Sequence, residues 1–304
     1  MRKSEKEERL AVGVDLGGTN IRVALINELG QILKECNRKT EADRDRDYII
    51  QNMITMIKTV KEDRQIQGIG IGSPGPINQV KGLILDPPNL KTLHQCSIVE
   101  MIQSEIKEIP IYLENDANVA ALAEARAGAG FGKKSVIYIT VSTGIGAGIV
   151  IDGKLFVGEQ GNAGEIGNMI IRESGPTVSN LNTGSLEALA SGTAIAREGK
   201  NRLGIHGGAK EVFQLAMDGD EVAINIVDEV ISYLSIGIAN LMHTFNPSIF
   251  VLGGGVMQSG SWLLPQLREK TADLLFPSMK NHLIIEPPML DKKAGVIGAG
   301  FLVI

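Results

Sequence analysis

The feature that most constrains this sequence is a set of glycine clusters, each next to a short run of β-branched apolar residues. The clusters lie at 13–18, 68–75, 144–148, 158–167 and 253–255. Glycine accounts for 36 of the 304 residues, well above the average of about 7%. Glycine at a strand end lets a ligand, commonly a phosphate, approach the backbone closely. The pattern therefore predicts an α/β chain with ligand sites at the ends of its strands.

The order of predicted elements repeats within the chain. Residues 11–15, 21–26 and 31–34 are predicted strands, with a tight glycine turn at 16–20. The same order returns with strands at 135–141, 149–151 and 154–157 and a glycine turn at 142–148. The second copy is roughly two residues shorter, yet an internal duplication of a phosphate-binding β-hairpin is the simplest explanation.

Apolar spacing predicts the remaining elements. Strands are expected at 69–72, 111–113 and 249–252, and helices at 47–63, 98–106, 117–127, 185–199, 209–217, 219–245, 259–275 and 291–303. A chain of 304 residues is longer than one compact core usually holds, so two domains are expected.

Charge and cysteine content exclude several classes of protein. The net charge of −5 gives no indication of a basic face for nucleic acid. Two cysteines, Cys36 and Cys96, are too few for a disulfide framework and are predicted to be reduced. Met1–Leu10 is too charged for a signal peptide, and we expect no window to approach the ~18 apolar residues of a membrane span. We expect a cytoplasmic protein with no nucleic-acid or membrane partner.

The first motif is Asp15-Leu16-Gly17-Gly18-Thr19-Asn20. Its two glycines let backbone N–H groups point at an anion, and Thr19 and Asn20 add side-chain donors. Asp15, at a strand end, is a candidate ligand of a hydrated Mg²⁺ near the phosphates. The motif is not a P-loop, because no Gly-Lys-Ser/Thr follows, and a strand replaces the helix of a dinucleotide-binding fold. An ordinary hairpin turn is the alternative.

Two further glycine motifs follow later in the chain. In Ser142–Gly148, Thr143 offers a hydroxyl to a terminal phosphate beside Gly144. Gly253–Gly255, after a buried strand, leaves bare backbone against which an adenine or ribose fits. A plain turn from strand to helix explains the last motif equally well.

Acidic residues supply the candidate chemistry. Asp116 lies in Glu114–Asn118, where a strand passes into a helix. A carboxylate within ~3 Å of a sugar hydroxyl can accept its proton, which typically accelerates a reaction about 10²–10⁴-fold. A helix cap worth ~1 kcal/mol is an equal alternative for Asp116. Glu165 and Glu187 suit hydrogen bonds from sugar hydroxyls, although an exposed glutamate is the more common reading of each.

Together and in this order, the motifs resemble the ROK family of sugar kinases and repressors. The resemblance runs from Val12 to the C-terminus and includes Ser73–Pro76 and Asn89. It implies a two-domain, actin-like and hexokinase-like (ribonuclease H-like) α/β fold with the active site in an interdomain cleft. It also implies a first domain of residues 1–116 plus 291–304, a second of residues 117–290, and a homodimer.

The resemblance implies a role for each matching position. Asp116 corresponds to the general base in phosphorylation of a hexose primary hydroxyl by MgATP, with glucose as the first candidate substrate. The sugar-contacting positions are Gly75, Asn89, Asn115, Asp116, Glu165, Asn168 and Glu187. The nucleotide-binding positions are Asp15, Gly17, Gly18, Thr19, Asn20, Thr143, Gly144, Gly254 and Gly255.

The chain departs from the family pattern at one point. Many members have His where this chain has Asn168, followed by three Cys that complete a structural zinc site, and here no Cys follows Cys96. We therefore expect ATP and Mg²⁺ but no zinc. Because that His also contacts the sugar, N-acetylmannosamine, fructose or a β-glucoside are alternative substrates. Family repressors carry a helix-turn-helix domain before the first loop, where this chain has about ten residues, so a transcriptional regulator is the less favoured alternative.

Overall fold

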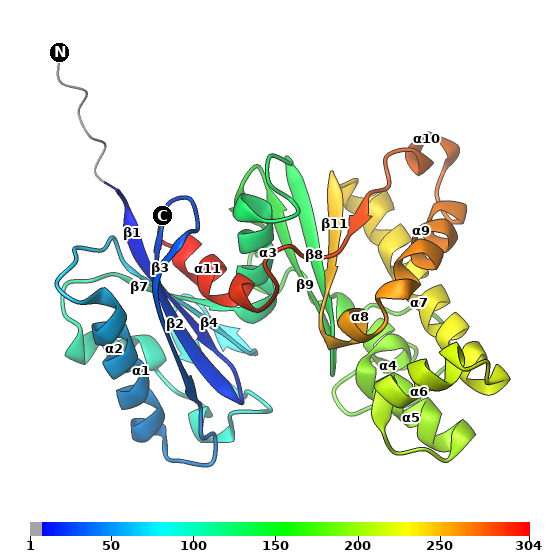
Figure 1. The fold of residues 1–304 in the computed structure, drawn as a ribbon, viewed down its shortest axis with the longest axis horizontal. Coiled ribbons are helices and arrows are strands. Elements are labelled where there is room, and N and C mark those ends of the chain that lie inside the picture. Colours follow the sequence, from blue (N-terminus) through cyan, green and yellow to red (C-terminus); the bar gives the residue numbers. More distant parts are fainter. Residues whose placement is uncertain (1–7) are drawn as a thin grey trace. The chain divides into compact units, whose positions relative to one another are not determined.

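The computed structural model describes residues 8–304, which form two compact units, each built on a five-stranded sheet (Figure 1). Unit 1 contains the chain up to Phe131 together with Leu290–Ile304, and unit 2 is Gly132–Met289. The stretch Met1–Glu7 lies outside the described residues, so the expectation that it is no signal peptide stays a prediction.

The sheet of unit 1 has the strand order β3-β2-β1-β4-β7. Its strands are β1 (Leu10–Leu16), β2 (Asn20–Asn27), β3 (Ile32–Lys39), β4 (Ile69–Ser73) and β7 (Ile111–Asn115). The first three form antiparallel hairpins, whereas β1, β4 and β7 run parallel. The carboxyl ends of these three parallel strands therefore lie along one edge of the sheet.

Helices cover both faces of this sheet. The buried apolar side chains of α1 (Arg46–Lys61) and α2 (Ile98–Glu105) share one core with alternate residues of β1, and Asp45 caps α1 by accepting the Tyr48 N–H. The opposite face contacts α11 (Ala294–Phe301), which packs on α3 (Asp116–Ala127). A short hairpin, β5 (Ile77–Asn78) and β6 (Leu83–Ile84), precedes α2. Both cysteines are free, Cys96 buried and Cys36 partly so.

Several of the glycines serve helix packing rather than a ligand. A Cβ added to Gly70 would lie 1.7 Å from the Ala299 carbonyl oxygen, and one on Gly13 would lie 1.9 Å from that of Val296. The backbone of α11 thus packs directly on β1 and β4. In the same way α3 approaches α11, where a Cβ on Gly298 would lie 1.7 Å from the Val119 oxygen.

This packing decides where the units divide. Because α3 is held against α11, it belongs to unit 1, and the division falls after Phe131. The division expected from the sequence, after Asp116, would have separated α3 from the helix it packs against. The second crossing, between Met289 and Leu290, lies within one residue of the expected position.

The sheet of unit 2 repeats the topology of unit 1, with the order β10-β9-β8-β11-β12. Its strands are β8 (Ser135–Val141), β9 (Ile145–Ile151), β10 (Lys154–Leu155), β11 (Ile249–Gly253) and β12 (Ile285–Glu286). In both units an antiparallel hairpin pair is followed by two parallel strands. The shared topology supports the internal duplication.

The second glycine turn is shorter than expected. Residues 145–148 belong to β9, where Gly146 pairs with Thr140 and Gly148 with Tyr138. Only Ser142–Gly144 forms the turn, and it has the same length as Gly17–Thr19 in unit 1. Small residues in β9 therefore reflect close packing by a later segment, described below.

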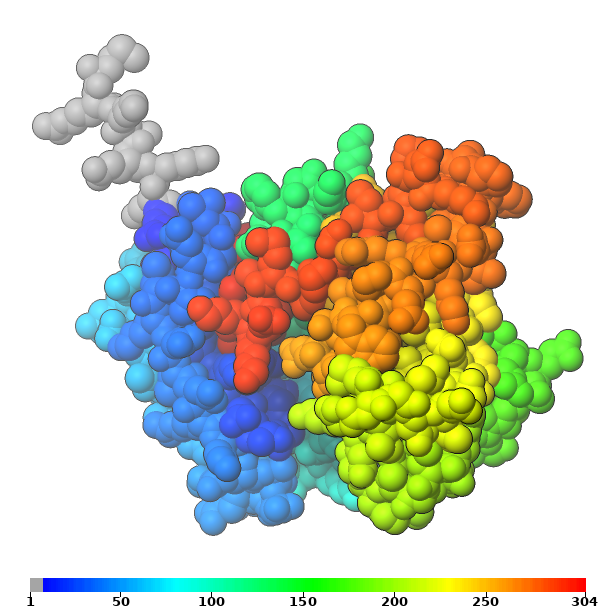
Figure 2. All heavy atoms as spheres, turned by 45° about the vertical axis from the view of Figure 1, so that its right-hand side comes forward, coloured from blue at the N-terminus to red at the C-terminus, as the bar shows by residue number. Residues whose placement is uncertain are grey.

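Most of unit 2 outside its sheet is helical, and part of this helical region is seen in lime, yellow and orange in the space-filling view (Figure 2). They are α4 (Leu186–Ala190), α5 (Gly192–Leu203), α6 (Gly208–Met217), α7 (Glu221–Phe245), α8 (Gly255–Ser259), α9 (Leu264–Asp273) and α10 (Pro277–Lys280). The helix expected over 185–199 is two helices, because Ser191 is extended and caps α5 by accepting the Ala194 N–H.

The expectation that no segment resembles a membrane span is wrong for α7. This helix has 25 residues and a mean hydropathy of 1.6 over its most apolar window, enough to cross a membrane by length and composition. Within unit 2, 56% of that window is buried. The helix is apolar on most sides because it packs against α4, α5, α6 and α9 at once, as the central helix of a soluble core does.

Candidate functional site

The predicted site residues fall into two groups, one in each unit. Unit 1 holds Asp15, Gly17, Gly18, Thr19, Asn20, Gly75, Asn89, Asn115 and Asp116; unit 2 holds Thr143, Gly144, Glu165, Asn168, Glu187, Gly254 and Gly255. Each group is described within its own unit.

The first glycine loop, Gly17–Thr19, is braced by a residue that the sequence did not point to. Thr40 is fully buried; its N–H donates to the Thr19 carbonyl at 3.0 Å and its hydroxyl donates to the Gly17 carbonyl. The Gly17 N–H closes the hairpin on the Asn20 carbonyl at 3.0 Å. The loop is therefore held rigidly while Thr19 remains exposed. No local pattern marks Thr40, because its partners lie about twenty residues away.

Asn89 lies directly against this loop. A Cβ added to Gly18 would be 2.9 Å from the Asn89 Cβ and 3.1 Å from its carbonyl oxygen. A glycine is needed at position 18 because any side chain there would collide with Asn89. One predicted sugar-contacting residue and one predicted phosphate loop are thus neighbours in unit 1.

Asp15 lies at the end of β1, facing the start of α11. Arg22 pairs with its carboxylate at 3.4 Å and also donates to the Lys292 carbonyl at 3.1 Å. A Cβ on Gly295 would lie 2.5 Å from the carboxyl carbon of Asp15, so this carboxylate borders the first turn of the helix. Burial raises the pKa of Asp15, and the charge of Arg22 opposes that rise.

The register of the sheet brings the first loop and the Asn115-Asp116 pair to one edge. Asp15 pairs with Gly72 on β4, and Gly72 pairs in turn with Glu114 on β7. Neighbouring strands lie about 4.8 Å apart, so residues that follow Asp15 and Glu114 emerge at the same edge, two strand spacings apart. Asp116 and Gly17 are each two residues beyond this row.

At the strand-to-helix junction Asn115 is the N-cap of α3, whereas one of the two sequence interpretations gave that role to Asp116. The Asn115 side-chain oxygen accepts the Ala117 N–H at 2.9 Å. Asp116 is the first residue of the helix and is exposed, and its carboxylate also accepts the Ala117 N–H, at 2.7 Å. Gly75 adjoins this junction, since a Cβ there would lie 3.1 Å from the Asn115 amide nitrogen.

Glu114 supports the junction from below, a role that the sequence analysis did not assign. It is 6% exposed, and one carboxylate oxygen accepts from the Gln79 amide at 2.6 Å and the Asn118 amide at 2.9 Å. The same oxygen accepts the Asn115 N–H at 2.8 Å. A glutamate at a buried position of a strand was the available signal, because an acidic side chain is rarely buried without partners.

The second glycine loop, Ser142–Gly144, is held by the start of α5. The Ser142 N–H donates to the Gly144 carbonyl at 2.8 Å, and Thr193 donates its hydroxyl to the Thr143 carbonyl at 2.8 Å. The Gly192 N–H donates to the Ser142 carbonyl at 2.7 Å. Thr143 itself is exposed, so its hydroxyl remains accessible as the prediction requires.

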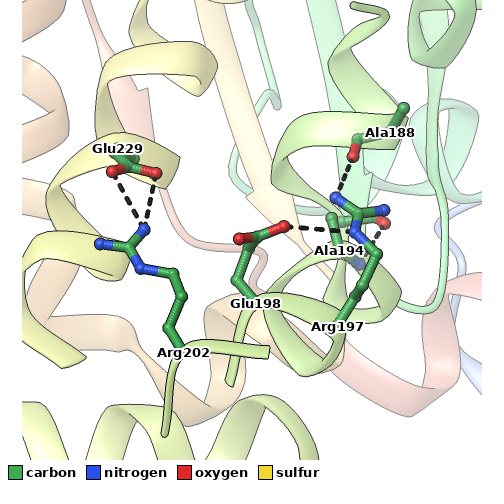
Figure 3. A network of polar contacts seen from close by, with 7 residues as sticks. Ala188, Ala194, Arg197, Glu198, Arg202 and Glu229 are labelled. Atoms are coloured by element: carbon green, nitrogen blue, oxygen red, sulfur yellow. Dashed lines mark hydrogen bonds and ion pairs between the residues drawn. The ribbon is translucent and has the colours of Figure 1, made fainter. Parts of the chain in front are cut away.

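Glu187 lies beside this loop. Its carboxylate accepts the Ile145 N–H at 2.6 Å, and a Cβ added to Gly144 or Gly167 would lie 2.6 or 3.0 Å from that carboxylate. The next residue is fixed as well, because Arg197 donates to the Ala188 carbonyl at 2.8 Å (Figure 3). The two glycines thus leave the space that the Glu187 carboxylate occupies.

Arginines attach α5 to its neighbours (Figure 3). Arg197 pairs with Glu198 at 3.2 Å within α5, while Arg202 pairs with Glu229 of α7 at 3.0 Å. The helix that supports the second loop is thereby tied to the central helix of the unit.

Glu165 follows Gly164, which packs on β9. A Cβ on Gly164 would lie 2.2 Å from the Ala147 carbonyl oxygen, which explains the small residues of β9. Glu165 as a residue is exposed, whereas its carboxyl group is partly desolvated. Desolvation raises the pKa of Glu165, and the nearby charge of Glu187 raises it further. The two predicted sugar-binding carboxylates therefore lie close to each other.

Asn168 is exposed and already hydrogen-bonded to its own unit. Its side-chain oxygen accepts the Asn182 N–H at 2.6 Å, and its carbonyl accepts from the Asn182 amide at 3.1 Å. Residues 8–304 contain no group of three or more His, Cys, Asp or Glu side chains that could hold a metal ion. The expected lack of zinc stays a prediction.

Of the third glycine motif, only Gly255 is open. A Cβ on Gly253 would lie 2.4 Å from the Tyr138 hydroxyl, and one on Gly254 would lie 2.3 Å from the Val141 carbonyl. Both glycines are therefore explained by packing on β8. Gly255 is exposed, and a Cβ there would meet only the Ser142 hydroxyl, at 3.9 Å, so of this motif it alone offers bare backbone.

Known proteins show which family this chain resembles. The ROK family pattern matches residues 11–304. This chain belongs to the ROK family. A glucokinase from Thermotoga maritima is 34% identical to it, over 96% of each chain. A glucokinase from Halalkalibacterium halodurans is 35% identical, over 97% of this chain and 95% of that one. A putative xylose repressor from Caldicellulosiruptor is 32% identical over 98% of this chain and 79% of the repressor.

Solved structures give the same result for the fold. The ROK hexokinase of Thermus thermophilus superimposes with a TM-score of 0.90 at 32% identity, over 97% of each chain. A glucokinase of this family from Streptomyces griseus, solved with glucose and AMPPNP, has a TM-score of 0.77 at 30% identity, over 97% of this chain and 99% of that one. The predicted family and actin-like fold class are thereby confirmed.

Proposed function

We propose that this protein is an ATP-dependent sugar kinase that phosphorylates a primary hydroxyl of a hexose, with glucose as the first candidate. Support comes from the glucokinase relatives and from the related glucokinase that binds glucose and AMPPNP. The structural observation that carries the proposal is the common sheet edge of Gly17–Thr19 and Asp116. A phosphate loop and an accessible carboxylate at the carboxyl ends of parallel strands are what this reaction needs.

Each proposed residue has one task in the reaction. Asp116 accepts the proton of the sugar hydroxyl while that oxygen forms a bond to the γ-phosphorus, and the bond from phosphorus to the ADP oxygen breaks. The Ala117 N–H at the α3 N-terminus donates to the Asp116 carboxylate at 2.7 Å and holds it in place. Asn115, Glu165 and Glu187 form hydrogen bonds that orient the sugar, assisted by Gly75 and Asn89. The two glycine loops and Gly255 hold the nucleotide.

Among the proposed nucleotide-binding residues, Asp15 is the candidate for a contact with magnesium. Mg²⁺ usually keeps several waters and binds through one or two carboxylates together with the substrate phosphates. Asp15 is a single carboxylate at a strand end, beside the first loop, and Arg22 lies 3.4 Å from it. Asp15 therefore suits a water-mediated contact to an ion that the phosphates hold. Such an ion would neutralise phosphate charge during transfer.

The deciding experiment measures ADP release with a panel of sugars. We expect turnover with one of glucose, mannose, N-acetylmannosamine, fructose, allose or a β-glucoside, and a fall of about 10²–10⁴-fold for Asp116→Ala. Asp63→Asn, an exposed carboxylate after α1 of the same unit, is the matched control and should retain full activity. Turnover of Asp116→Ala within tenfold of the unmodified protein would refute the assigned base.

A sugar-responsive regulator is the second candidate, supported by the xylose repressor relatives. An electrophoretic mobility assay with and without sugars separates it from the kinase. Sugar-dependent DNA binding without ADP release would favour the regulator. The expected homodimer, the cytoplasmic location and the lack of nucleic-acid and membrane partners stay predictions, the first of which sedimentation velocity tests directly.

A further inference from the structure

The segment between the two proposed sugar-binding carboxylates is closed by a reciprocal pair of asparagines. The Asn168 side-chain oxygen accepts the backbone N–H of Asn182 at 2.6 Å, and the Asn182 side-chain amide donates to the Asn168 carbonyl at 3.1 Å. Each side chain thus bonds to the backbone of the other residue. The pair therefore connects the two ends of the segment 169–181, which lies between the asparagines.

The backbone next to the asparagine pair continues the same closure. The Leu186 N–H donates to the Met169 carbonyl at 2.9 Å, and the Ile171 N–H donates to the Gly184 carbonyl at 2.8 Å. Ile170 and Ser185 form an antiparallel bridge. The two ends of the segment therefore run as a short irregular ribbon, and the asparagine pair sits at one end of it.

The ribbon connects Glu165 to Glu187. Glu165 lies three residues before Asn168, whose N–H contacts the Glu165 carbonyl at 3.4 Å, and Glu187 lies five residues after Asn182. Glu187 is fixed on its other side by the Ile145 N–H at 2.6 Å. Glu165 is exposed, and its segment packs on β9 on both sides of it, since a Cβ on Gly164 or Gly167 would lie 2.2 or 2.3 Å from the carbonyl oxygen of Ala147 or Ile145. The asparagine pair adds to this packing a further link between the segments that carry the two carboxylates.

We propose that Asn168 and Asn182 form a positioning clip that holds Glu165 and Glu187 at the spacing required to bind one sugar, and that Asn168 acts through its side-chain oxygen rather than as a donor to the substrate. The inference rests on the proposed kinase function and changes the role expected for Asn168. Its side-chain oxygen is already used within the protein, and Asn182, which no pattern in the sequence marked, becomes a partner of equal importance.

Matched variants separate the clip from a direct sugar contact. Asn168→Asp retains an acceptor for the Asn182 N–H, whereas Asn168→Ala removes it, and Asn182→Ala removes the other hydrogen bond. The clip predicts that Asn168→Ala and Asn182→Ala each raise the KM for the sugar between about twofold and tenfold, the effect of one lost hydrogen bond, while kcat is retained. Asn168→Asp should stay within about twofold when assayed at pH 8, where carboxylates are ionised. Ser179→Ala, an exposed residue of the same segment, is the control.

The opposite pattern would overturn the clip. If Asn168 donates its amide to the sugar, Asn168→Asp raises KM as much as Asn168→Ala does, and Asn182→Ala leaves KM unchanged. The dependence of KM on pH gives a second test. If the two carboxylates move apart in Asn182→Ala, the pKa of Glu165 falls towards its usual value. The acid limb of the KM profile then moves to lower pH in that variant. An unmoved limb contradicts a clip that fixes their spacing.

Hydrogen exchange tests the clip without any activity. The Asn182 amide should exchange about fivefold or more faster in Asn168→Ala and remain protected in Asn168→Asp, because only the former loses the acceptor. Equal exchange rates in all three proteins would refute the clip even if the kinase is active. Conversely, a protein that phosphorylates no sugar but shows this pattern would refute the proposed function and leave the clip intact.

Discussion

A fully buried glutamate in unit 1 allows a sharp test of the structure. Glu124, in the last turn of α3, is 0% exposed. One of its carboxylate oxygens accepts the Ala129 N–H at 2.8 Å, and the other accepts the Leu290 N–H at 2.8 Å. Ala129 follows α3 shortly before the chain leaves unit 1, and Leu290 is the residue at which the chain returns. One carboxylate thus binds the chain close to the point where it leaves unit 1 and at the residue where it returns.

The magnitude follows from these two hydrogen bonds. A hydrogen bond to a charged group contributes about 1.5–3 kcal/mol, so Glu124→Ala should reduce the free energy of unfolding of unit 1 by about 3–6 kcal/mol. That is a large part of the ~5–15 kcal/mol typical of a folded domain. Glu124→Gln keeps one acceptor oxygen and turns an N–H donor towards the other backbone N–H, so about half of the loss is expected.

Urea denaturation measures this effect separately in the two units. The only tryptophan of the chain, Trp262, lies in unit 2, so its fluorescence follows unit 2 while circular dichroism follows both. We expect the unit 1 transition to move to lower urea in the order Glu124→Gln, then Glu124→Ala. Glu100→Ala, an exposed position of α2, should change stability by less than about 0.5 kcal/mol. A Glu124→Ala protein within that same margin would refute the argument.

Two further predictions concern packing and pH. Gly70→Ala should cost unit 1 at least about 3 kcal/mol or prevent folding, since its Cβ would lie 1.7 Å from the Ala299 oxygen, and thermal unfolding measures this loss. Because the folded-state pKa of Glu165 is raised, the folded state binds more protons than the unfolded state between the two pKa values, so stability falls as pH rises through that window. Glu165→Gln should therefore raise the unfolding midpoint at pH 7 but not near pH 4, and an equal effect at both pH values would contradict the raised pKa.

Much of the fold could be predicted because its signals are local. The apolar run of β1 ends at a glycine turn, and the strand-to-helix change at Asn115 is visible from residue types alone. The repeated order of elements correctly indicated a repeated three-stranded unit, which is found as β1–β3 and β8–β10 in the two sheets. Periodicity could not separate strand from turn at Ile145–Gly148, because the small residues there are strand residues that leave room for Gly164 and Gly167.

The candidate site was less predictable, because its supports are distant in sequence. Thr40 braces a loop about twenty residues before it, and Gln79 reaches Glu114 across 35 residues. Glycine was ambiguous for the same reason. Gly70 is needed for a helix that comes more than two hundred residues later, and Gly18 for Asn89, so a glycine shows that something is close without showing what.

The two sheets share a topology, yet their corresponding strands lead to different structures, and this difference explains the division of tasks. In unit 1, β7 is followed by Asn115, Asp116 and the helix α3. Its counterpart in unit 2, β12, is followed by Pro287 and Pro288, and the chain then returns to unit 1. No helix begins at this proline pair, and neither proline has a backbone N–H, so nothing here holds a carboxylate as the Ala117 N–H holds that of Asp116. At this place unit 2 therefore has no counterpart of the proposed base Asp116, and its proposed sugar-binding residues Glu165 and Glu187 come from the chain after β10. It follows that the other copy of the sheet cannot replace the proposed base, so the loss of activity expected for Asp116→Ala should not be compensated by unit 2.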